Sequence, residues 1–147
     1  MTDYLVDNSV WARLASGDRG ITDRLRRIER APADLFVTCA PQVLEFCHSA
    51  RTPVEHRASR DQISLGFPLE RAPDESLVLE IQSALWDAGL VRAAGAVDIM
   101  IAGYAMVNDA TVLAADHDFE HIARVVDLQH EYVAPDPLRE RHRLLPG

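Results

Sequence analysis

The sequence predicts an α/β protein built on a parallel sheet. Three short apolar runs, at 4–6, 35–38 and 111–114, have the length of buried strands. Longer segments with apolar residues at helical spacing separate these runs, and such crossover connections favour parallel pairing. The chain of 147 residues is 48% hydrophobic and 26% charged, which suits one domain with an ordinary core and argues against disorder.

Capping residues, glycine and proline set the expected ends of the elements in the first half of the chain. Asn8 or Ser9 can cap a helix after the first strand, and this helix ends near Gly17. Pro41 suits the first turn of the helix that follows the second strand. The elements expected here are a strand at 4–6, helices at 10–16 and 21–30, a strand at 35–38, and helices at 41–46 and 54–65.

In the second half, Pro68 and Pro73 bracket an expected loop, and Gly95 separates two helices. We assign residues 1–135 to a single domain and residues 136–147, which are rich in Pro and Arg, to a flexible tail. The expected elements are helices at 74–92 and 97–108, a strand at 111–114, a short helix at 117–124 and a final strand at 131–133.

The charge balance excludes some kinds of chemistry. The chain has 15 basic residues, all of them arginine, against 23 acidic residues, and its net charge is −8. Without lysine there can be no Schiff-base lysine and no lysine of a phosphate-binding loop. The negative balance also argues against nucleic-acid binding through a general basic coat.

Nothing in the sequence suggests export or membrane insertion. The first residues lack a basic start and an apolar run of signal length, and no stretch approaches 18 apolar residues. Cys39 and Cys47 form no CxxC pair and lie in apolar surroundings, as inert core cysteines do. We therefore expect a cytoplasmic protein that does not contact a membrane.

Acidic residues recur where the predicted strands end and the helices begin. Asp7 ends the first strand, and Asp116 follows the third, with Asp118 two residues further on. Glu45 and Asp98 lie in otherwise apolar helices. Because strand ends and helix starts meet at one edge of a parallel sheet, we expect these acids to converge. Clustered carboxylates repel one another unless a cation neutralises them, and such oxygen ligands suit Mg²⁺ or Mn²⁺ rather than Zn²⁺.

Helix capping is the competing interpretation of these acids. For Asp7 and Asp116, each taken singly, capping is the better interpretation. Asp98 and Glu45 favour a functional site, because an unpaired acid among apolar neighbours is costly to bury. A cation bound there would lower the pKa of a bound water and neutralise charge on a phosphate.

Four motifs that contain these acids resemble those of the PIN-domain ribonucleases, and their order and the chain length match the VapC-type toxins of bacterial toxin–antitoxin pairs. The resemblance covers roughly residues 3–133. It implies a three-layer α/β/α sandwich with a central, mostly parallel sheet, and Mg²⁺- or Mn²⁺-dependent hydrolysis of RNA phosphodiesters. The motifs are LVDNSVW at 5–11, PQVLEF at 41–46, AVDIMIA at 96–102 and LAADHDFEHI at 113–122.

Carried over by motif, the resemblance implies an acidic site in which Ser9 orients a ligand or water. The sequence departs from the family at Asn8, where Thr is common, and at Ala114 and Ala115, where a Thr usually precedes the fourth acid. The second departure weakens the support for Asp116. The implied metal ligands are Asp7, Glu45, Asp98 and Asp116, of which Asp7 and Asp98 are the principal ones, and Asp118 is an accessory acid.

The resemblance also implies partners. The substrate would be RNA, and a cognate VapB-type antitoxin would hold the toxin inactive. The C-terminal segment of such an antitoxin would wrap a groove, and a basic side chain of it would often block the site. The apolar residues of the early helices and of 77–86 fit a core, a homodimer surface or this groove. We expect a homodimer.

Other activities leave weaker signals in the sequence. His117 and His121 have the i, i+4 spacing of two zinc ligands, but the zinc-protease pattern HExxH is absent. There is no G-x-S-x-G, GxGxxG or Walker loop. A catalytically inactive PIN-like module that binds RNA or protein, a metal-dependent phosphatase and a DNA nuclease remain as alternatives.

The arginines of the first half allow two interpretations. One is a solvated helix face. The other is a patch that binds the phosphates of RNA, because a guanidinium group can donate two hydrogen bonds to phosphate oxygens. The residues concerned are Arg24, Arg26, Arg27 and Arg30 on one predicted helix, together with Arg13 near the first acid.

Overall fold

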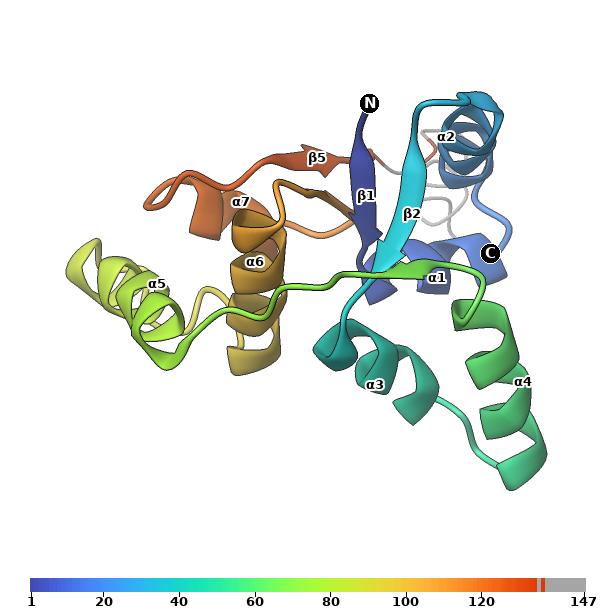
Figure 1. The fold of residues 1–147 in the computed structure, drawn as a ribbon, viewed down its shortest axis with the longest axis horizontal. Helices are drawn as coiled ribbons and strands as arrows, with labels where there is room; N and C mark the ends of the chain where they lie inside the picture. Colours follow the sequence, from blue (N-terminus) through green and yellow to red (C-terminus); the bar gives the residue numbers. More distant parts are fainter. Residues whose placement is uncertain (135, 137–147) are drawn as a thin grey trace, which may run out of the picture.

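A five-stranded, fully parallel sheet forms the centre of the protein. The structure is a computed structural model and describes residues 1–134 and 136. The strand order is β3-β2-β1-β4-β5, so the first strand lies in the middle (Figure 1). The strands are β1 (Asp3–Val6), β2 (Leu35–Thr38), β3 (Phe67–Pro68), β4 (Thr111–Ala114) and β5 (His130–Tyr132).

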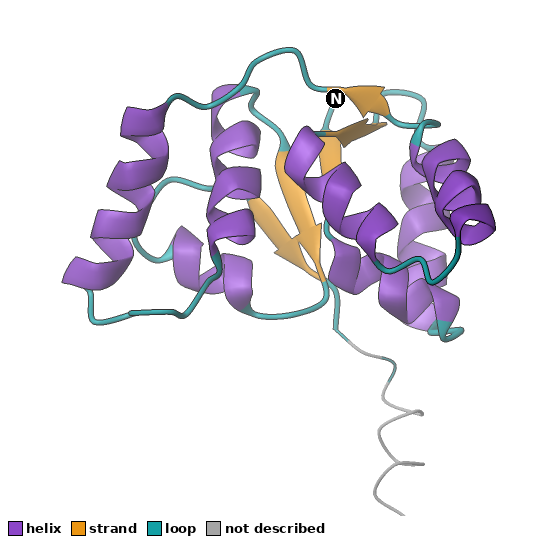
Figure 2. Cartoon of the chain, turned by 90° about the horizontal axis from the view of Figure 1, so that it is seen from below, coloured by secondary structure: helices purple, strands orange, loops and turns teal. Residues whose placement is uncertain are grey.

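Helices cover both faces of this sheet, which confirms the predicted three-layer α/β/α sandwich (Figure 2). Along β1, Leu5 points into a core with helices α5, α6 and α7, whereas Tyr4 and Val6 point into a core with α1 and α2. This alternation follows from the two-residue period of a strand. The helices are α1 (Asn8–Ala15), α2 (Arg19–Arg30), α3 (Ala40–His48), α4 (Pro53–Ile63), α5 (Glu75–Asp87), α6 (Ala96–Val107) and α7 (Asp118–Ala123).

The short strand β3 was not predicted and lies between the helix expected at 54–65 and the loop expected after Pro68. Its two residues pair in parallel with Val37 and Thr38 of β2, and Pro68 is tolerated because the strand is at the sheet edge. Gly66 permits this approach, since a Cβ atom there would lie 2.7 Å from the Thr38 Cγ2 atom. A two-residue strand has too little periodicity to be recognised in a sequence.

Several element ends also differ from the prediction. Helix α5 ends at Asp87 rather than at residue 92, because Gly89 adopts a positive φ of 73° and breaks the helix. Strand β5 begins at His130, one residue earlier than expected. The predicted tail lies outside the described residues except for Asp136. No helix among the described residues is long and apolar enough to cross a membrane.

Arg24 is not part of an open basic patch. Its guanidinium group donates to both carboxylate oxygens of Glu131 and to the Tyr4 hydroxyl, and so ties helix α2 to strands β5 and β1. Arg26, Arg27 and Arg30 on the same helix are exposed. This pairing favours a structural role for Arg24, and phosphate binding by the arginines of α2 stays a prediction.

Gln42 holds helix α3 against the carboxyl end of β1. Its side chain is only 2% exposed, and its amide donates to the Val6 carbonyl at 2.6 Å. Its carbonyl oxygen accepts from the Cys39 amide at 3.3 Å. Two buried backbone groups therefore depend on one side chain.

Replacing Gln42 with Leu should destabilise the fold without changing the volume of the core greatly. The Val6 carbonyl and the Cys39 amide would lose their side-chain partner, which costs about 1–3 kcal/mol. Urea unfolding should show a lower midpoint with an unchanged slope. Gln62→Leu is the matched control, because Gln62 is exposed on α4 and should shift stability by less than about 0.5 kcal/mol.

Candidate metal centre

Three carboxylates from three different elements converge at the carboxyl end of β1. Asp7 follows this strand, Glu45 lies on α3, and Asp98 lies in the first turn of α6. One oxygen from each lies within 4.8 Å of the others. The convergence occurs because parallel strands deliver the following segments to one edge of the sheet.

Asp7 is the most buried of the three acids. It is 4% exposed, and its Oδ2 atom accepts from the Ser9 amide at 3.1 Å, so it caps helix α1. Its own amide donates to the Leu113 carbonyl of β4 at 2.8 Å. The capping interpretation therefore holds for Asp7, and it is compatible with a second function for the remaining oxygen.

Glu45 contributes an oxygen that has no partner. Its Oε2 atom is buried and makes no hydrogen bond among the described residues. Burial raises the pKa of the Glu45 carboxyl, and the charges of Asp7, Asp116 and Asp118 raise it further. An unpaired buried carboxylate oxygen beside other carboxylates is costly unless a proton or a cation occupies the space.

Asp98 has the clearest electrostatic perturbation. Burial raises the pKa of its carboxyl to about 7, the Gly95 amide opposes the rise, and the charges of Asp7, Asp118 and Glu45 add to it. Its Oδ2 atom accepts from this amide at 3.2 Å. The Asp98 carboxyl therefore takes up a proton more readily than an ordinary aspartate does.

Asp116 and Asp118 flank the three converging acids. Asp116 is not in the group within 4.8 Å, but burial and then Asp7 raise the pKa of its carboxyl. Its Oδ1 atom accepts from the Asp118 amide at 3.2 Å at the start of α7. The site thus has a compact set of three acids and an outer pair.

Ser9 ties the start of α1 to the segment that follows β4. Its hydroxyl accepts from the Ala115 amide at 2.9 Å, which fixes the start of α1 to the chain just after β4. This bond sets the distance between Asp7 and Asp116. The expected contact of Ser9 with a ligand or water stays a prediction.

His117, the N-cap of α7, and His121 on α7 do not belong to the group of converging acids. Among residues 1–134 and 136, the group with metal-ligand geometry consists of Asp7, Glu45 and Asp98 and contains no histidine. The His117 Nδ1 atom is 2.8 Å from Glu120, and the His121 Nδ1 atom is buried without a hydrogen-bond partner. The geometry does not support a zinc site here.

Gln42 and Asp18 are two polar residues that the sequence analysis missed. Asp18 is 3% exposed and caps α2 by accepting from the Ile21 amide at 3.2 Å. Both are buried, and a buried polar side chain needs a hydrogen-bond partner. The position of Asp18 just before a helix was the available signal for its capping role.

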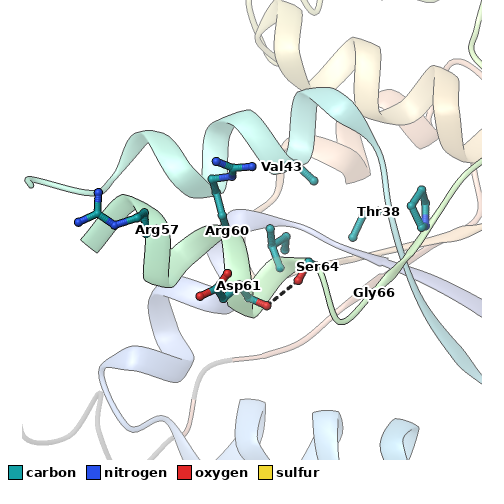
Figure 3. Close-up of a pocket in the computed structure, with 9 residues that line it drawn as sticks. Thr38, Val43, Arg57, Arg60, Asp61, Ser64 and Gly66 are labelled. Atoms are coloured by element: carbon teal, nitrogen blue, oxygen red, sulfur yellow. Dashed lines mark hydrogen bonds between the residues drawn. The ribbon is translucent and has the colours of Figure 1, made fainter. Parts of the chain in front are cut away.

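Two open cavities lie beside α3 and α4, outside the acid cluster. One has a volume of about 570 Å³ between α3 and α4, and Arg57 and Arg60 lie on its α4 side (Figure 3). The other has a volume of about 490 Å³. We call this second cavity the apolar groove, and its apolar side chains include Trp11, Leu14, Leu25, Phe36 and Leu65.

The donor set at the convergence point fits a divalent cation. All three candidate ligands are carboxylates, which is the hard oxygen chemistry of Mg²⁺ and Mn²⁺ sites. The unpaired Glu45 oxygen and the raised pKa of Asp98 both indicate a place where positive charge would be stabilising.

Comparison with known proteins identifies the family. Residues 4–125 match the PIN domain family. Ribonuclease VapC21 of Mycobacterium tuberculosis is 34% identical over 135 residues, which cover 90% of this chain and 94% of the relative.

Solved structures show the same fold at low sequence identity. VapBC2 from Rickettsia felis, bound to a DNA fragment from its promoter, matches with a TM-score of 0.70 and 14% identity, over 89% of this chain and 98% of that chain. DNA-bound VapBC from Salmonella typhimurium matches with a TM-score of 0.66 and 18% identity, over 90% of this chain and 98% of that chain. The resemblance in the sequence is therefore confirmed, and the chain belongs to the PIN domain family.

Proposed function

We propose that the protein is a divalent-metal-dependent endoribonuclease and the toxin of a toxin–antitoxin pair. The observation that carries the proposal is the convergence of Asp7, Glu45 and Asp98, with one Glu45 oxygen buried and unpaired. The relative named Ribonuclease VapC21 supports RNA as the substrate. An inactive binding module would need neither the three acids nor their costly proximity.

Asp7, Glu45 and Asp98 would hold the cation, which we propose is Mg²⁺ or Mn²⁺, with Asp116 in an outer position. A bound divalent cation supplies an activated water for in-line attack on phosphorus and screens the charge that develops on the phosphate. Asp7 is fixed by the Ser9 amide, and Asp98 by the Gly95 amide. These bonds hold the two carboxylates in place before substrate arrives.

Glu45 and Asp116 are the candidates for handling the proton of the attacking water. Burial raises the pKa of both carboxyls, and a raised pKa makes a carboxylate a better proton acceptor near neutral pH. Glu45 has the free oxygen for this task. Asp118 adds negative charge that keeps the pKa of Glu45 and Asp98 high.

We propose that a VapB-type antitoxin occupies the apolar groove. The similar VapBC structures from Rickettsia felis and Salmonella typhimurium support such a complex. Trp11 lies in this groove, and its buried indole N–H has no hydrogen-bond partner among the described residues. The apolar side chains that line the groove are what an apolar partner segment would cover. The second assembly that we propose is a homodimer. Its support is a set of exposed apolar side chains, which includes Leu44, Trp86 and Val97.

Removal of a single acid should abolish cleavage of RNA in Mg²⁺. Asp7→Asn, Glu45→Gln and Asp98→Asn should each lower kcat/KM by at least about 100-fold, because each removes a cation ligand or the proton acceptor. Cleavage of labelled single-stranded RNA followed on denaturing gels measures the effect, with Glu80→Gln as the control, since Glu80 is exposed on α5.

Chelation should have the same effect on the wild-type protein. EDTA should stop cleavage, and excess Mg²⁺ or Mn²⁺ should restore it. Cleavage that persists in EDTA would contradict the proposed function. Loss of cleavage in the Glu80→Gln control would show that the assay reports folding rather than the site.

Asp98→Asn should stabilise the metal-free protein at alkaline pH. The pKa of Asp98 is about 7 in the fold against an ordinary value of 3.8. Between these values the folded state binds more protons than the unfolded state, so this carboxyl makes stability fall as pH rises. The full shift corresponds to about 4 kcal/mol, which solvent screening at this partly exposed site reduces to about 1 kcal/mol.

Thermal unfolding in EDTA measures this effect. At pH 8, Asp98→Asn should unfold about 2–4 °C above the wild type, and the difference should vanish towards pH 4. Glu80→Gln should show no such dependence. A lower midpoint for Asp98→Asn at pH 8 would mean that the carboxylate is not under repulsion in the fold.

A further inference from the structure

Two aromatic rings are stacked at the carboxyl edge of the sheet, the edge where the acids also lie. The ring centroids of His117 and Tyr132 are 4.6 Å apart, with an interplanar angle of 27°. His117 directly follows Asp116 at the carboxyl end of β4, and Tyr132 lies on β5 in register with Ala114. The pair thus belongs to the same edge of the sheet as the acids.

The fold does not require the His117 ring. His117 occupies the N-cap position of α7, but its side chain makes no capping hydrogen bond. The Asp116 carboxylate accepts from the Asp118 amide instead. The His117 side chain is 62% exposed, so its contribution to the hydrophobic core is small.

The ring is nevertheless held in one orientation. Its Nδ1 atom is 2.8 Å from Glu120 Oε2, and the Tyr132 ring supports it by stacking. An exposed aromatic side chain that is fixed on two sides loses little conformational entropy when a ligand binds. This arrangement is typical of a contact surface rather than of a freely solvated residue.

The position of the ring relative to the acids suits a nucleotide. The Cα atoms of consecutive residues are about 3.8 Å apart. The side chains of Asp116 and His117 therefore leave the backbone at nearly the same point of the sheet edge. A phosphate at the acids would therefore place an adjoining base near the rings.

We propose that His117 and Tyr132 form a stacking platform for one nucleobase next to the cleaved phosphodiester of single-stranded RNA. This inference rests on the proposed function and names the form of its substrate. Aromatic side chains bind unpaired bases by stacking, whereas bases within a duplex are already stacked and inaccessible. Stacking also requires no net positive charge, which suits a protein with a net charge of −8.

A binding experiment tests the platform without relying on cleavage. The probe is single-stranded oligoadenylate in which 2-aminopurine replaces one adenine, because stacking on an aromatic ring quenches its fluorescence. The full chain with Asp98→Asn is the parent, so that the RNA stays intact. The parent should quench the probe, and His117→Ala should weaken binding by about 5- to 100-fold with loss of quenching.

Two further variants separate stacking from other effects. His117→Phe should retain both affinity and quenching, because it keeps a ring and removes the imidazole nitrogens. His56→Ala removes an exposed histidine of α4 and should behave as the parent. Failure of the parent to quench the probe would overturn the platform, as would equal affinity and quenching in His117→Ala.

Cleavage by the otherwise wild-type chain provides the second measurement. An RNA that the enzyme cleaves is compared with versions that lack one base beside the cut. Loss of the stacked base should lower kcat/KM for the wild type about 5- to 100-fold and have little further effect in His117→Ala. Equal losses in both proteins would overturn the platform.

The two measurements distinguish failure of the inference from failure of the proposed function. Quenching without any cleavage by the wild-type chain would refute the ribonuclease and leave the platform as an RNA-binding site. Cleavage with identical behaviour of wild type and His117→Ala would refute the platform alone.

Discussion

Repulsion between carboxylates at one edge of the sheet is the constraint on which the site depends. Asp7, Glu45 and Asp98 lie within 4.8 Å of one another, and burial removes much of the water that would screen them. Rigid backbone connections hold them there. The Asp7 amide bonds to β4, and Gln42 bonds helix α3 to the end of β1. Helix α3 therefore cannot easily move Glu45 away from Asp7, and the repulsion persists until a proton or a cation relieves it.

This repulsion links stability to function. In the proposed metal site, a bound cation would relieve the repulsion between the ionised carboxylates, so this repulsion would contribute to metal affinity. Asp98 shows the balance most clearly, because its pKa of about 7 places protonation and metal binding in competition near neutral pH. The outer acids act on the same balance, since Asp118 raises the pKa of both Glu45 and Asp98. The site thus functions as one electrostatic unit rather than as separate ligands.

Much of this arrangement could be predicted from the sequence, because strand ends in a parallel sheet have a fixed location. Asp7 and Asp98 could be placed at the same edge by counting strands and helices alone. The short strand β3 could not, since two residues show no period and its pairing depends on the tight approach of Gly66 to Thr38. The pairing of Arg24 with Glu131 spans 107 positions, and such long-range contacts leave no local pattern. The His117–Tyr132 stack was missed for the same reason.

The net negative charge of the chain limits the ways in which it can bind RNA. A protein with a net charge of −8 cannot attract RNA through bulk charge, and Arg24 is already paired with Glu131. Attraction must then be local, where a cation at the acids would meet a phosphate and exposed rings would meet a base. Both contacts lie at the carboxyl edge of the sheet. A single-stranded segment can satisfy both at once because its bases are free to turn towards the protein. Under the proposed function, the parallel sheet supplies a substrate-binding edge that does not need a basic surface.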